Sequence, residues 1–472
     1  MGQYSTHTLI RMHLLFFIIL CLLLWACPVL AAGTNLLQSV EAALDYNPEL
    51  KASQEKRQAY GHSVDKARSG FFPRIAAEVG GGYSQRSDTT LRAYDDANKV
   101  RAYGDASLLL IQPIWRGGYT TADVAVRRAL YDSADSQLED SGTSLVFQAI
   151  VAHVEVLRRA ELVALAKNNV KEHAEILDTV RRRTSGQIAT MGELHQVEGR
   201  HARAKGTLSS YETDLDAAHA AYLNITGNVA QSLISAPAPS KAYGSLDNAL
   251  QACLDGNKRI RSAVSEVEAA SGEKDMARSR FYPSINLEAG PTWSDRNNKN
   301  MASSRITEVG MGLRIRWDLL SGGEDMANMA IAEARIRQAK QNLHTVMDSL
   351  SKDIEATYSH YMSSQEQTTL YEAAKGYSRL AREDYYRQFL SAQRNLLDVL
   401  DAENDYFYAA VQQVMSQGDR IIAGYRLLAL SGELLTSLGL DPAILRVDTH
   451  TTTGDVENLR MVVPTSLRGN MK

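Results

Sequence analysis

The spacing of hydrophobic residues switches twice in each half of the chain, from a helical period to strict alternation and back. Apolar and polar residues alternate over 285–294 and over 308–317, and a shorter alternation covers 75–83. Such alternation is typical of strands with one apolar and one polar face. The run 108–114 is more continuously apolar, so the direction of its two faces is ambiguous. We predict two pairs of strands, each strand about ten residues long.

Long helical patterns follow each pair of strands. No proline lies between Pro113 and Pro237. None lies between Pro291 and Pro442 either, which favours uninterrupted helices. Apolar residues at seven-residue spacing indicate supercoiled antiparallel helices, and they are Val156, Val163, Val170 and Leu177. The predicted long helices cover 119–185, 193–226, 323–390 and 395–439. The first would be about 100 Å long.

The chain contains two copies of one unit. Segment 67–73 matches 277–283 at an offset of 210 residues, and the Gly-Gly pair at 117–118 matches 322–323 at an offset of 205. Internal repeats of this kind organise a whole chain rather than a local motif. Each copy is therefore expected to hold a shorter helical region, two strands and a hairpin of two long helices.

These repeats define the predicted domains. The domains are a signal peptide (1–32), a first structural repeat (33–235), a linker (236–245), a second structural repeat (246–440) and a C-terminal tail (441–472). The shorter helical regions cover 36–70, kinked or broken at Pro48, and 246–280. The tail has little periodicity, so it is expected to be flexible or wrapped around the helices.

The first thirty residues have the pattern of a secretory signal. Arg11 and His13 precede an apolar run over 14–25, and a small-residue cleavage site follows at 29–31. A membrane anchor is the alternative, but the run is too short to span a bilayer. Cys27 lies in a sequence resembling a lipidation site, yet the bulky Trp25 favours ordinary cleavage.

Composition and cysteine usage narrow the function classes. The 51 basic and 55 acidic residues give a net charge of −4, which argues against a nucleic-acid partner. Without the leader, Cys253 is the single cysteine and cannot form an internal disulfide. The histidines are not at metal-ligand spacing, so no metal is predicted; those considered are His153, His173, His195 and His201.

The number of strands predicts an oligomer. After the leader no apolar run is long enough for a transmembrane helix, so entry into a membrane would require β-structure. Four strands cannot close a barrel, and known barrels begin at about eight. Three chains would supply about twelve strands and a usable bore, which suits the polar faces of the strands. Amphipathic hairpins on a soluble core are the alternative interpretation.

The order of elements, the duplication and the segment 389–404 resemble the TolC family of outer-membrane channels. The resemblance covers nearly the whole mature chain, to about residue 440. It implies a mainly α fold with a small membrane β-barrel: a TolC-like trimer with a long antiparallel α-helical barrel and a 12-stranded β-barrel, four strands per chain. It also implies an outer-membrane location with the helical barrel in the periplasm, no enzymatic activity and no cofactor.

Two carboxylates near the second helical tip are candidates for a selectivity ring. Asp398 and Asp401 are spaced i, i+3, so they share one face of a helix. In a threefold assembly each becomes a ring of three carboxylates that attracts cations. An ordinary acidic helix start is the alternative. The TolC resemblance places the periplasmic selectivity ring at these two positions.

The resemblance also implies a periplasmic gate. Arg394 matches the gating arginine of the family, and its acidic partner falls near Glu193. Phe389 matches a tyrosine of the family gate, so the hydroxyl of that tyrosine is missing here. The arginine tract 181–183 near the first tip is interpreted as a solvated helix face, with an acidic adaptor as the alternative.

Aromatic residues near the strand ends fit membrane-interface anchors, with core aromatics as the alternative. They are Tyr83, Trp115, Trp293 and Trp317.

The sequence favours a channel that serves as the exit duct of a tripartite machine. The resemblance implies a homotrimer in outer-membrane lipid that works with a periplasmic adaptor (membrane fusion) protein and an inner-membrane ABC or RND-type transporter. Type I protein secretion is the first prediction, because 388–390, Arg394 and 396–398 look most like secretion members. Efflux of drugs, small molecules or metals is the alternative, and a periplasmic coiled-coil scaffold is the alternative outside the channel class.

Overall fold

The computed structural model describes residues 33–85, 87, 89–93, 98–239, 243–296 and 305–446. The predicted signal peptide, Cys27 and most of the predicted tail lie outside the described residues. The described chain forms two compact units. The sheet unit comprises 47–147, 239–363 and 423–446, and the tip unit comprises 33–46, 148–238 and 364–422.

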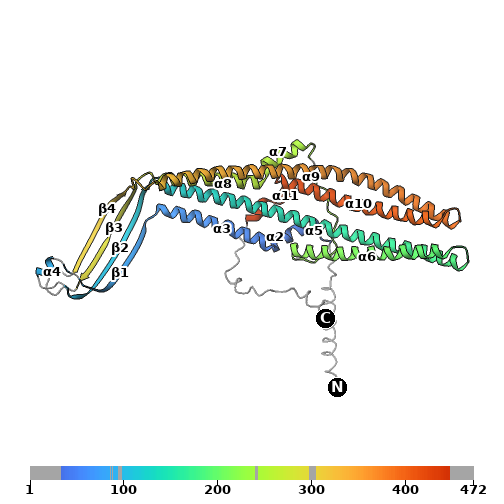
Figure 1. Cartoon of the computed structure of the whole chain (residues 1–472), viewed down its shortest axis with the longest axis horizontal. Helices are drawn as coiled ribbons and strands as arrows, with labels where there is room; N and C mark the ends of the chain where they lie inside the picture. The colour runs from blue at the N-terminus through green and yellow to red at the C-terminus, as the bar shows by residue number, and fades with distance from the viewer. Residues whose placement is uncertain are drawn as a thin grey trace, which may run out of the picture. The chain divides into compact units, whose positions relative to one another are not determined.

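The sheet unit holds one antiparallel sheet of four strands in the order β1-β2-β3-β4. Figure 1 shows these strands side by side. The strands are β1 (Arg74–Gln85), β2 (Val100–Arg116), β3 (Ser284–Arg296) and β4 (Arg305–Arg316). They are longer than the ten residues expected, but the two predicted pairs are confirmed. One pair comes from each repeat, and β2 joins β3 across the repeats.

The strand register places the apolar positions of all four strands on one face, because directly opposed residues share a face. Ile75 is opposite Leu110, Leu110 is opposite Ala289, and Ala289 is opposite Met311. This alignment settles the ambiguous run in β2, whose Leu108 joins the apolar face. The opposite face carries polar residues, including the ion pair between Glu288 and Arg314 at 2.7 Å.

A β-bulge between Pro113 and Trp115 redirects the end of β2. Proline has no N–H for the ladder, so pairing is interrupted there. The extra residue turns Trp115 to the position opposite Ile285, on the apolar face. Without the bulge the alternation of β2 would aim Trp115 at the polar face.

The helices of the sheet unit begin at asparagine caps that repeat with the duplication. Asn47 ends α2 (Leu36–Tyr46) and caps α3 (Pro48–Arg68), while Asn257 ends α7 (Leu246–Gly256) and caps α8 (Lys258–Ser279). Each asparagine side chain accepts a hydrogen bond from the second residue beyond it. The break at Pro48 is confirmed. The helical region predicted over 246–280 is likewise divided, at Asn257 and without a proline.

The long helices agree closely with the predicted ranges. They are α5 (Tyr119–Ser185), α6 (Met191–Thr226), α9 (Glu324–Leu390) and α10 (Leu396–Leu430). The helix predicted over 395–439 is too long, because Gly432 adopts a positive φ of 75° and the chain continues into α11 (Leu434–Ser437). No described helix is both long and apolar enough to cross a membrane.

The last described residues are docked on the sheet unit by η2 (Pro442–Arg446). Leu445 is buried, and its side chain occupies the space that a Cβ on Gly142 would take. The Arg446 guanidinium bonds to the carboxylates of Asp135, at 2.7 Å, and Glu139. Burial alone would raise the pKa of Asp135, but hydrogen bonds from Arg446 and Arg57 lower it below its usual value. This start of the tail is therefore held by both packing and charge.

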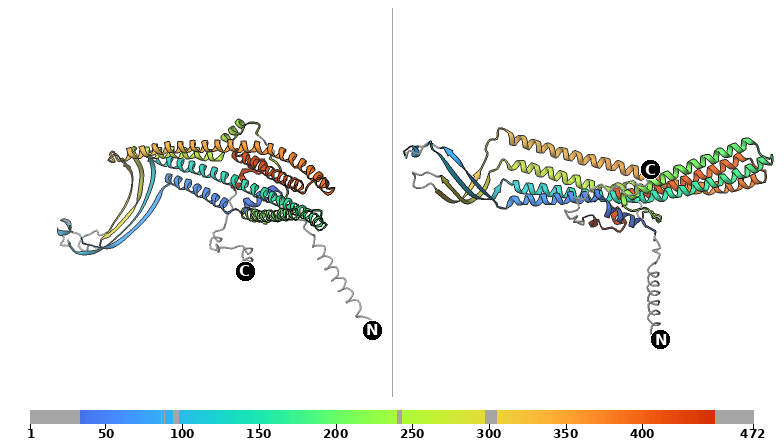
Figure 2. Two further views of the ribbon diagram at one scale, coloured as in Figure 1. Left: turned by 45° about the vertical axis from the view of Figure 1, so that its right-hand side comes forward. Right: turned by 90° about the horizontal axis from the view of Figure 1, so that it is seen from below.

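In the tip unit the two helical hairpins run lengthwise beside each other. The right-hand view of Figure 2 shows the green helices, α5 and α6, alongside the red and orange α10 and α9. One polar cluster ties the start of the described chain to the first hairpin: the hydroxyl of Ser39 is 2.9 Å from Nδ1 of His153 and 2.8 Å from the hydroxyl of Tyr222. All three side chains are buried, so this cluster is structural.

Candidate functional site at the helical tips

The two turns that connect the long helices have the same local structure. In each turn one residue adopts a left-handed backbone conformation, Gln187 in the first and Ala392 in the second, both with φ of 59°. A reverse hydrogen bond closes each turn, from Ile188 N–H to Arg183 O at 2.8 Å and from Gln393 N–H to Gln388 O at 2.9 Å. The duplication is therefore preserved in the backbone of the tips.

The helices that leave the tips are capped at equivalent positions. Thr190 and Glu193 form a capping box at the start of α6, where Glu193 accepts the Thr190 N–H at 2.7 Å. At the start of α10 the Asn395 side chain accepts the N–H of Asp398 at 2.9 Å. Asp398 and Glu193 are thus the same position of the repeat, at the offset of 205 residues seen in the sequence. A carboxylate in the first helical turn is also stabilised by the helix dipole.

Arg394, the predicted gating arginine, makes its contacts within the second hairpin. Its Nε donates to Gln388 at 2.9 Å, and its guanidinium lies 3.7 Å from the centre of the Tyr385 ring. Its third contact is an ion pair with Asp398 at 3.2 Å. Within this chain, Arg394 and Glu193 therefore each bond inside their own hairpin rather than to each other.

Asp401, the second predicted ring residue, pairs with the other hairpin. The Arg200 guanidinium on α6 donates to Asp401 on α10 at 3.1 Å. The Arg200 side chain is 26% exposed and the Asp401 side chain 56% exposed. Exposed ion pairs of this kind are worth about 0.2–1 kcal/mol each, so the pair does not hold the hairpins together by itself.

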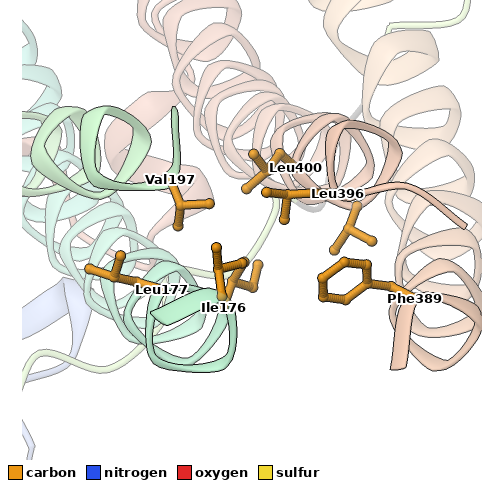
Figure 3. Close-up of a cluster of buried hydrophobic side chains, with 8 residues drawn as sticks. Ile176, Leu177, Val197, Phe389, Leu396 and Leu400 are labelled. Atoms are coloured by element: carbon orange, nitrogen blue, oxygen red, sulfur yellow. The ribbon is translucent and has the colours of Figure 1, made fainter. Parts of the chain in front are cut away.

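A hydrophobic cluster holds the hairpins instead. Phe389, at the end of α9, is only 5% exposed. It is packed in the cluster drawn in Figure 3 with Ile176, Leu177, Val180, Val197, Leu396, Val399 and Leu400, which come from α5, α6 and α10. Fully burying side chains of this size contributes about 1.5–3 kcal/mol apiece, which exceeds the contribution of the surface ion pairs.

Arg183 covers this cluster from the first hairpin. Its guanidinium lies 4.2 Å from the centre of the Phe389 ring and donates to the backbone oxygens of Phe389 at 3.0 Å and Leu390 at 3.1 Å. The last carbonyls of α9 have no partner within the helix, so a cation placed there satisfies them. Phe389 lacks the hydroxyl of the family tyrosine, and its packing and its arginine contact link the two hairpins.

A buried carboxylate lies farther along the same helices. Glu403 on α10 accepts hydrogen bonds from Asn169 at 3.3 Å and Arg382 at 3.4 Å. Its side chain is 4% exposed. Burial raises the pKa of Glu403, which Arg382 partly opposes and Glu172 reinforces. Because the folded pKa is raised, this group favours the folded state at low pH and loses that contribution as the pH rises through the folded pKa.

The predicted interface aromatics lie toward the two ends of the sheet. Trp115 and Trp317 are at the end nearer the helices, where Trp115 stacks edge-on against Tyr282 and Trp317 donates to the backbone oxygen of Phe281. Trp293 lies toward the other end, opposite Ala106, and Tyr83 lies opposite Ala102. Ile285, which is opposite Trp115, lies eight residues before Trp293 on β3. This separation corresponds to about 26 Å. That spacing resembles the height of an apolar band between two aromatic girdles, about 25 Å.

Two tip residues were not identified from the sequence. Arg183 belongs to the tract interpreted as a solvated face, and Arg200 gave no signal at all. Arg183 contacts residues more than 200 positions away, and so does Arg200. Local periodicity cannot reveal which residues of two long hairpins will meet.

The comparisons with known proteins agree with this fold. The sequence model of the family described as "Outer membrane efflux protein" matches residues 39–228 and 249–433, one segment in each repeat. The chain is 23% identical to the outer membrane efflux protein BepC of Brucella suis over 91% of this chain and 94% of the relative. It is 21% identical to the alkaline protease secretion protein AprF of Pseudomonas aeruginosa, over 86% and 85% respectively.

Solved structures share the architecture at low identity. The structure described as CusC aligns with a TM-score of 0.73 and 17% identity, covering 87% of this chain and 93% of that chain. The outer-membrane channel OprN aligns with a TM-score of 0.74 and 17% identity, covering 86% and 90%. These likenesses support the fold.

Duplicated long helical hairpins and a four-stranded sheet are the fold that this chain shares with these outer-membrane channel structures. The chain belongs to the outer membrane efflux protein family. It is therefore an outer-membrane channel protein with its helical part in the periplasm, and not an enzyme. The prediction of a TolC-like channel is confirmed, and the scaffold alternative is not supported.

Proposed function

We propose that three copies of this chain form the exit duct of a tripartite export machine for type I protein secretion. The channel proposal rests mainly on the four-stranded sheet. One face of this sheet is apolar, and its outer strands β1 and β4 have no further strand beside them in the described chain. Backbone groups left unpaired in lipid cost several kcal/mol each. Three copies would pair β4 of each chain with β1 of the next in a closed twelve-stranded wall.

The tips would form the closed periplasmic gate of this duct. Arg394 and Phe389 are at the end of the second hairpin, and Glu193 is at the equivalent end of the first. In a trimer, Arg394 and Glu193 of neighbouring chains can meet across the axis. A periplasmic adaptor would open the gate by separating the hairpins, and an inner-membrane ABC transporter would supply the energy.

Asp398 and Asp401 would form two acidic rings at the mouth of the duct, one helical turn apart. Replacing both with alanine is expected to lower the cation-to-anion permeability ratio roughly twofold or more, because fixed carboxylates concentrate cations at a narrow mouth. The measurement is the reversal potential of the purified protein in planar bilayers under a salt gradient. Unchanged selectivity in a conducting double variant would remove the ring assignment.

Support for secretion over efflux comes from relatives named for protease secretion. AprF is one, and the PrtF protein of Dickeya chrysanthemi is another, at 23% identity over 80% of this chain. Efflux remains the second candidate, because BepC is named as an efflux protein and covers more of the chain.

Deletion and complementation in the native host separate the two candidates. Under the secretion proposal, deletion removes at least one large protein from the culture medium, and the intact gene restores it. The inhibitory concentrations of drugs and metals should change little. An unchanged set of secreted proteins with inhibitory concentrations lowered roughly fourfold or more would favour efflux.

A further inference from the structure

The two carboxylates of the proposed rings differ in how the chain itself neutralises them. Asp398 is paired with Arg394, four residues earlier on the same hairpin, at 3.2 Å. Asp401 is paired with Arg200, on the other hairpin, at 3.1 Å. Each aspartate therefore has its own arginine. One of these arginines, Arg200, is supplied by a helix that carries no ring residue.

We propose that Arg200 is a specificity-determining residue of the channel, which sets the effective charge of the mouth by neutralising Asp401. This inference rests on the ring proposed above and adds a counter-charge to it. Opposite charges 3.1 Å apart act on a passing ion almost as a dipole, so the field of the carboxylate is largely cancelled at distances beyond the pair.

The surroundings of Arg200 support this assignment. The nearby His173 is buried, and its pKa is lowered to about 4 by burial, with a further contribution from the charge of Arg200. His173 is therefore neutral near pH 7 and does not compete for Asp401 as a cation. His201, the neighbour of Arg200 on α6, also has a lowered pKa, because of burial and then the charge of Lys205. Arg200 is thus the permanent cation at this carboxylate.

Exposure leaves the pair able to influence ions. The Asp401 side chain is 56% exposed, so its carboxylate borders solvent even while it is paired. Removing Arg200 would leave the negative charge of Asp401 without a counter-charge, at a carboxylate that water and ions already reach. A trimer would have three such charges.

Breaking the same ion pair from its two ends tests the proposal. Arg200→Gln removes the cation and Asp401→Asn removes the anion, and both variants lose the same bond between the hairpins. We expect Arg200→Gln to raise the cation-to-anion permeability ratio roughly twofold and Asp401→Asn to lower it, measured as reversal potentials of the full-length protein in planar bilayers. The difference should grow at low salt, because screening weakens.

Arg203→Gln is the matched control. Arg203 is an exposed arginine on the same helix, three residues from Arg200, and no ion pair of its side chain is found in the described structure. It should change the ratio much less than Arg200→Gln does. In an Asp401→Asn background Arg200 is left as a cation without a counter-charge, so adding Arg200→Gln should raise the ratio back toward that of the unaltered protein.

The possible outcomes are distinct. If Arg200→Gln and Asp401→Asn shift selectivity in the same direction, the pair acts only as a structural link and the proposal is overturned. Equal shifts for Arg200→Gln and Arg203→Gln would also overturn it. If the double alanine variant changes selectivity but Arg200→Gln does not, the acidic rings are supported and the proposed role of Arg200 is refuted. A protein without any conductance would instead refute the proposed channel.

Discussion

Replacing Phe389 with alanine is expected to destabilise the closed tip by about 3–5 kcal/mol and to make the channel leaky. Phe389 is 5% exposed and contributes to a cluster from α5, α6, α9 and α10, so its loss leaves a cavity between the two hairpins. The variant also loses the contact of the Arg183 guanidinium with the ring, worth about 0.5–1 kcal/mol or more. The exposed ion pairs at the tip are too weak to compensate.

Two measurements check the Phe389→Ala prediction. Single-channel conductance should rise because the hairpin ends separate more often, and protease should cleave the tip turns faster. Leu390→Ala is the matched control, since Leu390 is the next residue and its side chain is 51% exposed. Phe389→Leu keeps most of the buried volume and should be intermediate. Identical behaviour of Phe389→Ala and Leu390→Ala would show that the cluster does not hold the gate.

The long helices could be predicted closely because their ends carry local signals. Glycine pairs mark the starts near Tyr119 and Glu324, and the tip turns mark Ser185 and Leu390. The break at Asn257 was missed because the first copy has Pro48 after its cap, whereas the second copy has lysine at that position. The capping asparagine was the remaining signal, and asparagine alone is a weak one.

For a different reason, the sequence could not predict which side chains of β2 lie on the apolar face of the sheet. Its residues 108–111 are all apolar, so alternation gives no direction, and the side chain of Trp115 changes face at a bulge. A bulge depends on the pairing with β3, which comes from the other repeat. Register between distant strands is a tertiary property, and the sequence of one strand does not contain it.

The residues of the candidate site show the same difference between local signals and tertiary contacts. Asp398, Arg394 and Phe389 lie within one tip: the helix-face spacing with Asp401 pointed to Asp398, and the resemblance to the TolC family pointed to Arg394 and Phe389. Arg183 and Arg200 act on residues of the other hairpin, and their partners depend on how two hairpins align side by side. Sequence reasoning therefore named gate residues at both tips, Glu193 in the first and Arg394 and Phe389 in the second, but missed Arg183 and Arg200, which contact the other hairpin.

Replacing Gly290 with alanine is expected to prevent β2 and β3 from pairing correctly and to abolish most folding into the membrane. A Cβ at Gly290 would lie 1.8 Å from the backbone oxygen of Leu108 and 2.9 Å from its carbonyl carbon. Backbone atoms cannot rotate away as a side chain can, so β2 would have to move by about 1 Å or more. That displacement breaks ladder bonds at the junction of the two repeats, where Pro291 already supplies no N–H.

Gly310 provides an internal control for the Gly290→Ala prediction, because it is directly opposite Gly290 on β4. Apart from its own chain neighbours, no atom of the described residues lies within 4 Å of a Cβ added there. Gly310→Ala should fold normally. The amount of protein that is inserted in outer membranes and migrates as a compact species before heating measures folding. We expect Gly290→Ala to lose roughly nine-tenths of that species, since a shifted central ladder leaves unpaired groups in lipid at several kcal/mol each. Equal yields of the two variants would mean that β2 and β3 do not approach each other this closely in the folded channel.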